Sequence, residues 1–207
     1  MKVLLVNGSP HAKGCTYTAL TEIAKTFDEE GIEWEIFDVG MKPISGCLGC
    51  GRCVELGKCV IEDTVNEFTK KAKEADGFIF GTPVHYAAAS GALTSFMDRA
   101  FYSGGKDTYY LKPAACIASA RRAGTTAAFE QINKYFTISQ MPVISSKYWN
   151  MVHGSKPEDV LEDKEGLQCM RTLARNMAWF LKIKDAGQKA GVPLPKTETP
   201  IRTSFIR

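Results

Sequence analysis

Residues 7–16, NGSPHAKGCT, combine glycines with hydroxyl and basic side chains in one short loop. The loop follows the apolar run of residues 2–6 and precedes apolar residues at helical spacing, which predicts a strand, a loop and a helix. The start of a helix offers unpaired backbone N–H groups and the positive end of its dipole. We therefore expect a phosphate site, to which Ser9 and Thr16 add hydroxyl donors and His11 and Lys13 a positive field.

This loop departs from the common nucleotide-binding patterns. Gly14 comes six residues after Gly8, and Cys15 stands where the P-loop pattern requires a lysine. The dinucleotide pattern G-x-G-x-x-G is also incomplete, because its second and third glycines are missing. The sequence thus disfavours a kinase or an ordinary nicotinamide-binding half. The alternative to a phosphate site is a plain strand-to-helix turn with a serine cap.

A second group of residues that could carry chemistry is a set of four cysteines, spaced C-x2-C-x2-C-x5-C. These are Cys47, Cys50, Cys53 and Cys59. Three thiolates at two-residue gaps can wrap one corner of a cuboidal cluster, and the fourth returns after a short turn, so one [4Fe–4S] centre is the first hypothesis. Zinc, which usually takes two separated C-x2-C pairs, is the second. A loop that carries no metal is the remaining alternative.

The other three cysteines have simpler interpretations. The total of seven is odd, which argues against a disulfide framework in a reducing compartment. Cys116 and Cys169 fall in apolar segments and are expected in the core. Asp98 and Arg99 are candidates for a structural or intersubunit ion pair.

The elements that must position these residues alternate between strands and helices. Apolar runs predict strands near residues 2–6, 32–36, 77–80, 113–120 and 143–146. Helical spacing predicts helices between them, and Ser155 and Glu158 predict a capping box for a long closing helix. The fold class is therefore α/β, a doubly wound five-stranded parallel sheet of order 2-1-3-4-5 with helices on both faces. Such sheets bind ligands at the carboxyl ends of their strands, where loops 7–16, 82–90 and 119–125 would meet.

Length and patterning predict one domain over residues 1–190, with a cysteine-rich insertion at 40–61. Residues 191–207 are rich in proline and predict an extended tail, lying on the surface or on a neighbouring subunit through Ile201, Phe205 and Ile206. The chain of 207 residues is 44% hydrophobic, and its net charge of +3 is spread among mixed acids and bases, so no nucleic-acid surface is expected. No apolar run reaches the roughly 18 residues of a membrane span, and no signal peptide is recognisable, so we expect a cytoplasmic protein without membrane insertion.

Three segments resemble a known family when taken together. NGSPHAKGCT resembles the flavin-phosphate loop G-S-P-R-x-x-G-N-T of the flavodoxin-like NAD(P)H-dependent FMN reductases. GTPVHYAAASGALTSFMDRA resembles their G-[ST]-P-V-Y-[FY] segment and the L-K-x-[FL]-x-D-R segment after it. CLGCGRCVELGKCVIEDTV resembles the cysteine segment of the iron–sulfur flavoproteins within the same family. The resemblance covers residues 1–125 and is loose after them.

The resemblance implies a set of FMN contacts. Around the phosphate it implies Ser9, His11, Cys15 and Thr16, where His11 replaces the usual arginine and Cys15 the usual asparagine. Along the ribityl chain and the ring it implies Pro83, Val84, His85 and Tyr86. At the pyrimidine edge of the ring it implies Ser119, Ala120 and Gly124. It also implies a homodimer or homotetramer in which a neighbour closes over the flavin.

Three functional hypotheses follow. The first is an FMN-binding oxidoreductase that passes electrons from NAD(P)H to a small acceptor such as flavin or quinone. The second is an electron carrier that exchanges electrons between ferredoxin and FMN through a [4Fe–4S] cluster. The third is a binding module without flavin. Since the cofactor carries the redox chemistry, we assign no catalytic side chain; the sequence also lacks hydrolase and glycosidase spacings.

Overall fold

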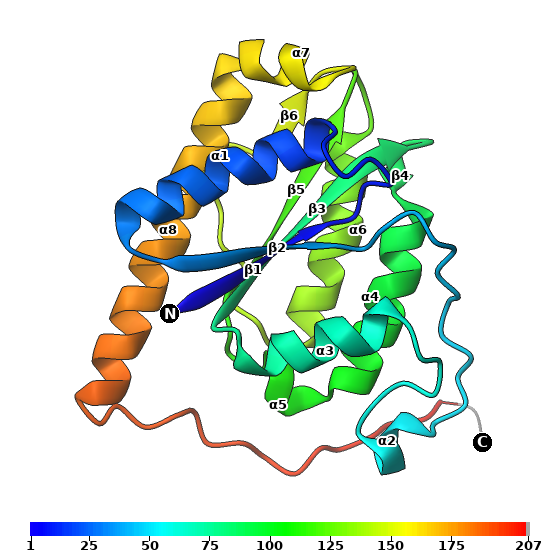
Figure 1. Cartoon of the computed structure of the whole chain (residues 1–207). Helices are drawn as coiled ribbons and strands as arrows, with labels where there is room; N and C mark the ends of the chain where they lie inside the picture. Colours follow the sequence, from blue (N-terminus) through cyan, green and yellow to red (C-terminus); the bar gives the residue numbers. More distant parts are fainter. Residues whose placement is uncertain (206–207) are drawn as a thin grey trace.

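A parallel sheet with helices on both faces forms the body of the protein (Figure 1). The computed structural model describes residues 1–205. The sheet contains β1 (Lys2–Asn7), β2 (Glu33–Asp38), β3 (Gly77–His85), β5 (Ala114–Ala120) and β6 (Met151–His153), in the order β2-β1-β3-β5-β6. A sixth, two-residue strand, β4 (Ala88–Ala89), pairs antiparallel with the end of β3. When β4 is set aside, the five parallel strands follow the predicted order 2-1-3-4-5.

The apolar strand residues divide between two cores because successive side chains point to opposite faces of a sheet. Val3 and Leu5 pack on one face with α1 (Cys15–Glu30) and α8 (Lys164–Lys189). Leu4 and Val6 pack on the other face with α3 (Thr64–Glu74), α4 (Gly91–Gly104) and α6 (Thr125–Ile138). Burial on both faces explains why β1 is a continuous apolar run. The short helices are α2 (Cys53–Leu56), α5 (Lys106–Tyr109) and α7 (Pro157–Glu162).

The last strand lies later in the chain than its predicted position at residues 143–146. Val143 forms a single bridge to Ala114 at the start of β5. The chain then leaves the sheet and returns as β6, where Met151 pairs with Ala118 near the end of β5. The apolar run was therefore a correct sign of contact with β5, but the extended ladder forms in a shorter segment that sequence patterning did not reveal. As a result, the loop after β6 reaches the carboxyl edge of the sheet.

The predicted long closing helix is divided into α7 and α8. Asp163 separates them, because its carboxylate accepts hydrogen bonds from the backbone N–H groups of Gly166 (2.9 Å) and His153 (2.7 Å). The predicted capping pair Ser155 and Glu158 is also wrong by one position. Asp159 accepts from the backbone N–H groups of Ser155 (2.9 Å) and Lys156. Pro157 stands in the first turn of α7, which moves the capping acid one residue along the chain.

Close backbone packing brings the first loop onto the end of β3. The backbone N–H of Gly8 donates to the carbonyl of Gly81 at 2.9 Å. A Cβ at Gly8 would lie 2.8 Å from that oxygen, so only glycine fits there. Beyond this contact β3 runs on into a hairpin with β4, whose turn residues Tyr86 and Ala87 have φ of 51° and 59°. Positive φ at both turn residues matches the twist of a two-residue hairpin and projects Tyr86 into solvent.

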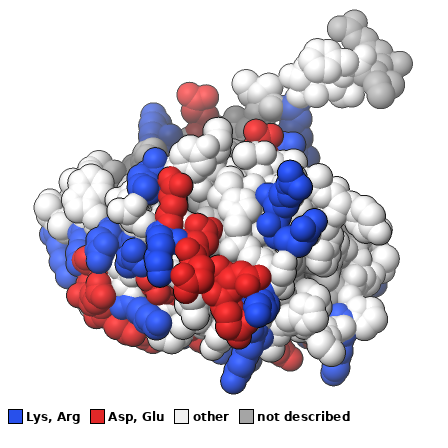
Figure 2. Space-filling model, turned by 90° about the horizontal axis from the view of Figure 1, so that it is seen from above, with Lys and Arg blue, Asp and Glu red and all other residues white. Residues whose placement is uncertain are grey.

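The surface carries mixed charges (Figure 2), and the C-terminal tail is extended. Figure 2 shows acidic and basic side chains interspersed on one face of the molecule. No helix in the part of the chain that the structure describes combines the length and the apolarity needed to cross a membrane. Residues 192–205 contain no helix or strand, and Ile201 and Phe205 are exposed. Ile206, which we also assigned to the tail contact, lies outside the described residues.

Candidate functional site

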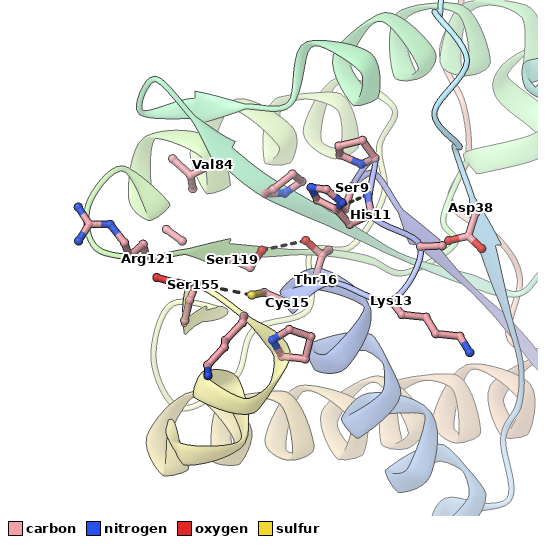
Figure 3. Close-up of a pocket in the computed structure, with 18 of the residues that line it drawn as sticks. Ser9, His11, Lys13, Cys15, Thr16, Asp38, Val84, Ser119, Arg121 and Ser155 are labelled. Atoms are coloured by element: carbon pink, nitrogen blue, oxygen red, sulfur yellow. Dashed lines mark hydrogen bonds between the residues drawn. The ribbon is translucent and has the colours of Figure 1, made fainter.

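A cleft of about 960 Å³ opens at the carboxyl edge of the sheet. Its walls come from the loop after β1, the end of β3, the loop after β5 and the loop between β6 and α7, which meet in Figure 3. The volume falls in the range typical of cofactor pockets. The strand ends converge on it as expected for a doubly wound sheet, whose crossover connections leave a crevice beside the first strand.

The first loop is held in place by hydrogen bonds before any ligand contact. Asn7 is fully buried; its side-chain oxygen accepts from the backbone N–H of Ser9 (3.2 Å), and its amide donates to Asp38 (2.8 Å). The Ser9 hydroxyl in turn accepts from the backbone N–H of His11 (3.1 Å). These bonds fold the loop so that it ends at Gly14, where α1 begins. No side chain among residues 1–205 caps α1, so its first amides keep their donor capacity.

Two side chains in the first turn of α1 connect this cradle of backbone amides to neighbouring elements. The hydroxyls of Thr16 and Ser119 form a buried hydrogen bond of 2.8 Å, which joins the start of α1 to the end of β5 (Figure 3). The Cys15 thiol donates to the carbonyl of Gly154 at 3.6 Å. Burial raises the pKa of Cys15, so the thiol stays protonated at neutral pH. The cradle therefore adds no negative charge of its own from Cys15.

The structure brings most of the predicted site residues together. Those that line the cleft are Ser9, His11, Cys15, Thr16, Pro83, Val84, Ser119 and Ala120. The structure places three others elsewhere: His85 and Tyr86 are exposed on the hairpin, and Gly124 packs under it. A Cβ at Gly124 would lie 2.7 Å from the Cα of Ala87, and its φ is +95°. His85 and Tyr86 are not among the residues that line the cleft; β3 continues past its predicted end and places them on the exposed hairpin.

Sequence reasoning missed several residues that also line the cleft. They are Asp38, Gly40, Met41, Arg121, Gly154, Ser155, Lys156 and Pro157. Those at 154–157 were missed because the last strand was placed too early. Arg121 follows a predicted strand directly and Asp38 follows one after a single intervening residue, positions that could have identified them. In Figure 3 the Lys13 and Arg121 side chains extend from opposite ends of the cleft, and Asp38 lies on the side of Lys13.

The four clustered cysteines line a second, smaller cavity beside α4. Leu48, Val60, Ile61 and Arg99 share its wall with Cys47, Cys50, Cys53 and Cys59. Gly49, Gly51 and Gly57 have φ of 62°, 69° and 64°, which lets the chain turn sharply between the thiols. Burial raises the pKa of Cys53, and its three neighbouring thiols add to this effect. Within residues 1–205 no three His, Cys, Asp or Glu side chains gather tightly enough to hold a single metal ion.

One buried arginine connects this segment to the body. Arg99 of α4 is 1% exposed and forms two hydrogen bonds to Asp63, of 2.6 and 2.9 Å. Burial opposes its charge, but the hydrogen bonds and charge of Asp63 and Cys59 outweigh this and raise the pKa of Arg99. The ion pair expected for Asp98 and Arg99 is thus formed with Asp63 instead, while Asp98 accepts a hydrogen bond from Tyr135.

The fold and the position of the cleft identify the structural class of the protein. A solved flavodoxin from the Archaea superimposes with a TM-score of 0.59 at 15% identity, covering 88% of this chain and 99% of that one. The fold is therefore flavodoxin-like, as the sequence predicted.

Sequence comparison then gives the family. The family model of the NADPH-dependent FMN reductases matches residues 1–156. Two iron–sulfur flavoproteins of Methanocaldococcus jannaschii are similar throughout. One is 34% identical over 88% of this chain and 98% of its own length, and the other 31% identical over 89% and 98%. The chain belongs to the NADPH-dependent FMN reductase family, which confirms the expected oxidoreductase class with FMN as cofactor and NAD(P)H as co-substrate.

Proposed function

We propose that the carboxyl-edge cleft is the FMN site of an NAD(P)H-dependent oxidoreductase, with the phosphate at the start of α1. The observation that supports it best is the cradle itself: uncapped amides, a buried Thr16 hydroxyl and a neutral Cys15 thiol surround one spot. The first turn of α1 contains no acidic residue. An anion placed there gains backbone donors and the helix dipole without meeting an acidic side chain from the first turn of α1.

The remaining lining residues have roles that follow from their chemistry. Pro83 and Val84 offer an apolar wall to a flat ring, and the loop after Ser119 offers backbone donors to the polar ring edge. Lys156 and Arg121 supply positive charge at the mouth, where a negatively charged nicotinamide nucleotide approaches. When bound, FMN supplies the redox chemistry by accepting a hydride from NAD(P)H and passing electrons onward. The chain itself binds and orients the flavin and excludes water from it.

The acceptor that receives these electrons is proposed to be a small molecule such as free flavin or a quinone. The cleft is open to solvent, so a second flat molecule can reach the ring. Anaerobic NADPH oxidation, followed with FMN-loaded protein and then with each acceptor added, tests this directly. Turnover only with an acceptor supports the proposal; FMN-loaded protein that does not consume NADPH contradicts it.

The phosphate assignment has its own test. FMN and riboflavin are titrated separately into flavin-free protein, with flavin fluorescence as the signal. We expect FMN to bind at least 100-fold more tightly, since two to three charge-assisted hydrogen bonds contribute roughly 1.5–3 kcal/mol each. Equal affinity for the two flavins would show that the cradle does not hold the phosphate.

A second proposed activity uses the cysteine cavity. We infer that Cys47, Cys50, Cys53 and Cys59 hold one [4Fe–4S] cluster that exchanges electrons between FMN and a ferredoxin. Three facts support this: four thiols line one cavity, glycines permit tight wrapping, and the relatives from Methanocaldococcus jannaschii are named iron–sulfur flavoproteins. Thiolate sulfur is the ligand that iron–sulfur clusters require.

Purification without oxygen, followed by iron and sulfide analysis, tests the cluster. Four iron and four sulfide per chain is the expected result, on the stoichiometry of such clusters. Zinc without sulfide would favour a mononuclear zinc site. A protein that contains neither iron nor zinc after reconstitution would show that the cysteine segment is only a structural loop. Reduction of the bound flavin by ferredoxin, but not by NADPH, would make the electron carrier the main function.

The assembly and location expected from the sequence also remain proposals. We propose a homodimer or homotetramer in the cytoplasm, and the exposed Ile201 and Phe205 of the tail are consistent with contact between subunits. Light scattering of the full chain and of a chain ending at residue 190 tests this. An unchanged mass after truncation would show that the tail does not hold the subunits together.

A further inference from the structure

Arg99 directs its whole guanidinium group at the cysteine segment. Nη1 and Nη2 bind the two carboxylate oxygens of Asp63, and Nη2 also donates to the carbonyl of Ile61 at 3.0 Å. Nη1 also donates to the carbonyl of Ser45 at 3.4 Å, and the third nitrogen, Nε, donates to the sulfur of Cys59 at 3.3 Å. The planar fork thus fixes the direction of the Nε–H group, because the two bonds to Asp63 prevent the guanidinium from rotating.

A cysteine that ligates a metal does so as a thiolate, and the Nε–H of Arg99 is placed to donate to the sulfur of Cys59. A neutral thiol is a weak acceptor, whereas a thiolate accepts charge-assisted hydrogen bonds. The geometry is therefore matched to Cys59 as a thiolate ligand. Asp63 balances the charge of Arg99, so the net contribution toward Cys59 is mainly the oriented N–H group.

We propose that Arg99 is a positioning residue of the cysteine site: it holds Cys59 as a ligand and raises the reduction potential of the bound cluster through the Nε–H to Sγ hydrogen bond. This inference rests on the proposed cluster. One-electron reduction adds a single negative charge and no atom, and part of that charge falls on the ligand sulfurs. A hydrogen bond to sulfur becomes stronger as that charge grows, so it favours the reduced form.

The same contact explains how a mostly exposed segment keeps one ligand fixed. Cys47 and Cys50 are exposed, whereas Cys59 is half-buried. The side chain of Asn66 adds hydrogen bonds of 3.0 Å to the backbone N–H and carbonyl of Cys59. Residues of two helices, α3 and α4, therefore hold Cys59 in position.

The test compares anaerobically purified wild-type protein with Arg99→Lys, Arg99→Met and Asp98→Asn. Lysine keeps the charge but loses the planar fork, and methionine removes both. Asp98 is the matched control, because it neighbours Arg99 in the chain but is bonded to Tyr135. Midpoint potentials are measured by redox titration with electron paramagnetic resonance, and FMN binding is measured as a check of folding.

We expect the reduction equilibrium of the cluster to become at least tenfold less favourable in Arg99→Met, which corresponds to about 59 mV for one electron. Arg99→Lys should shift in the same direction by less, and Asp98→Asn should match the wild type. If the Arg99 variants keep both the cluster and the wild-type potential, the role of Arg99 is overturned and the proposed cluster is not. A wild type without iron and sulfide would instead overturn the proposed cluster, and this inference with it.

A measurement on the wild type covers the case in which the Arg99 variants do not fold. Protein is produced with arginine labelled with ¹⁵N in the guanidinium group only, and the reduced cluster is examined by pulsed electron paramagnetic resonance. A hydrogen bond from Nε to the Cys59 sulfur should give a weak ¹⁵N coupling. A loaded cluster without such a coupling would overturn the proposal.

Discussion

The carboxyl-edge cleft and the cysteine cavity are built in opposite ways. In the cleft, Asn7, Ser9, Thr16 and Ser119 are buried and already hydrogen-bonded to one another or to backbone. In the cysteine segment, the two leading thiols are exposed and the chain lacks regular structure from residue 41 to residue 52. The first site is therefore complete in the folded chain, and the second depends on few fixed contacts, chiefly those of Arg99.

The difference follows from where each site sits in the sheet. Asn7 and Ser119 lie at the ends of the inner strands β1 and β5, so the two cores determine their positions. The cysteine segment connects β2, an edge strand, to α3, and only a part of it meets the body. Metal binding is commonly coupled to folding where ligands are not preformed, whereas a preformed pocket binds without that cost. The comparison predicts that the two sites fail independently.

The largest expected effect is loss of the cluster without loss of flavin. Replacing Cys53 by alanine removes one of four thiolates, so iron and sulfide should fall to background. FMN affinity should stay within about twofold, because surface changes away from a site usually cost under 0.5 kcal/mol. Metal analysis and flavin titration of the same sample measure both. Simultaneous loss of FMN binding would show that the sites are coupled and would break the comparison.

The next effect concerns charge inside the phosphate cradle. Cys15→Asp places a carboxylate beside the phosphate, and like charges about 4 Å apart repel by about 4 kcal/mol at an effective dielectric constant near 20. Allowing for solvent in the open cleft, we expect roughly 100-fold weaker FMN binding. Cys15→Ser is the matched control and should bind FMN nearly as the wild type does. Iron content should be unchanged in both variants; full FMN affinity in the aspartate variant would place the phosphate elsewhere.

A smaller effect is expected from the bond between Thr16 and Ser119. Thr16→Val leaves the Ser119 hydroxyl buried without that partner, which should lower the free energy of unfolding by about 1–3 kcal/mol. Denaturant unfolding of flavin-free protein measures it. The double variant with Ser119→Ala should cost less than the sum of the two single variants. Additive costs would mean that the hydrogen bond contributes no stability to the cleft.

The smallest effect is a pH dependence of thiol reactivity. Iodoacetamide should modify the exposed Cys47 and Cys50 of metal-free protein before the partly buried Cys15. Because the pKa of Cys15 is raised, its thiolate fraction is small at neutral pH and grows only above its usual range near 9. Its labelling should therefore accelerate most steeply in alkaline solution, as peptide mapping by mass spectrometry would show. Rapid labelling of Cys15 at pH 7 would contradict the buried, protonated thiol.

Much of this architecture could be predicted from local patterns. The order of the parallel strands, the first loop and the four cysteines were all recognisable, because each depends on residues close together in the chain. Errors arose where contacts decide between similar local patterns. Residues 143–146 and 151–153 are both short and apolar in part, and only pairing with β5 selects the second as the strand.

By itself, the sequence determined a parallel sheet, a glycine- and hydroxyl-rich loop after its first strand and a thiol-rich connection after its second, since periodicity and spacing are properties of neighbouring residues. Only the tertiary structure decided that Gly154 and Lys156 line the cleft, that His85 and Tyr86 lie exposed on the hairpin, and that Arg99 pairs with Asp63. The physical reason is packing. Arg99 and Asp63 are 36 residues apart, and only the fit of α3 against α4 brings their charges within 2.6 Å.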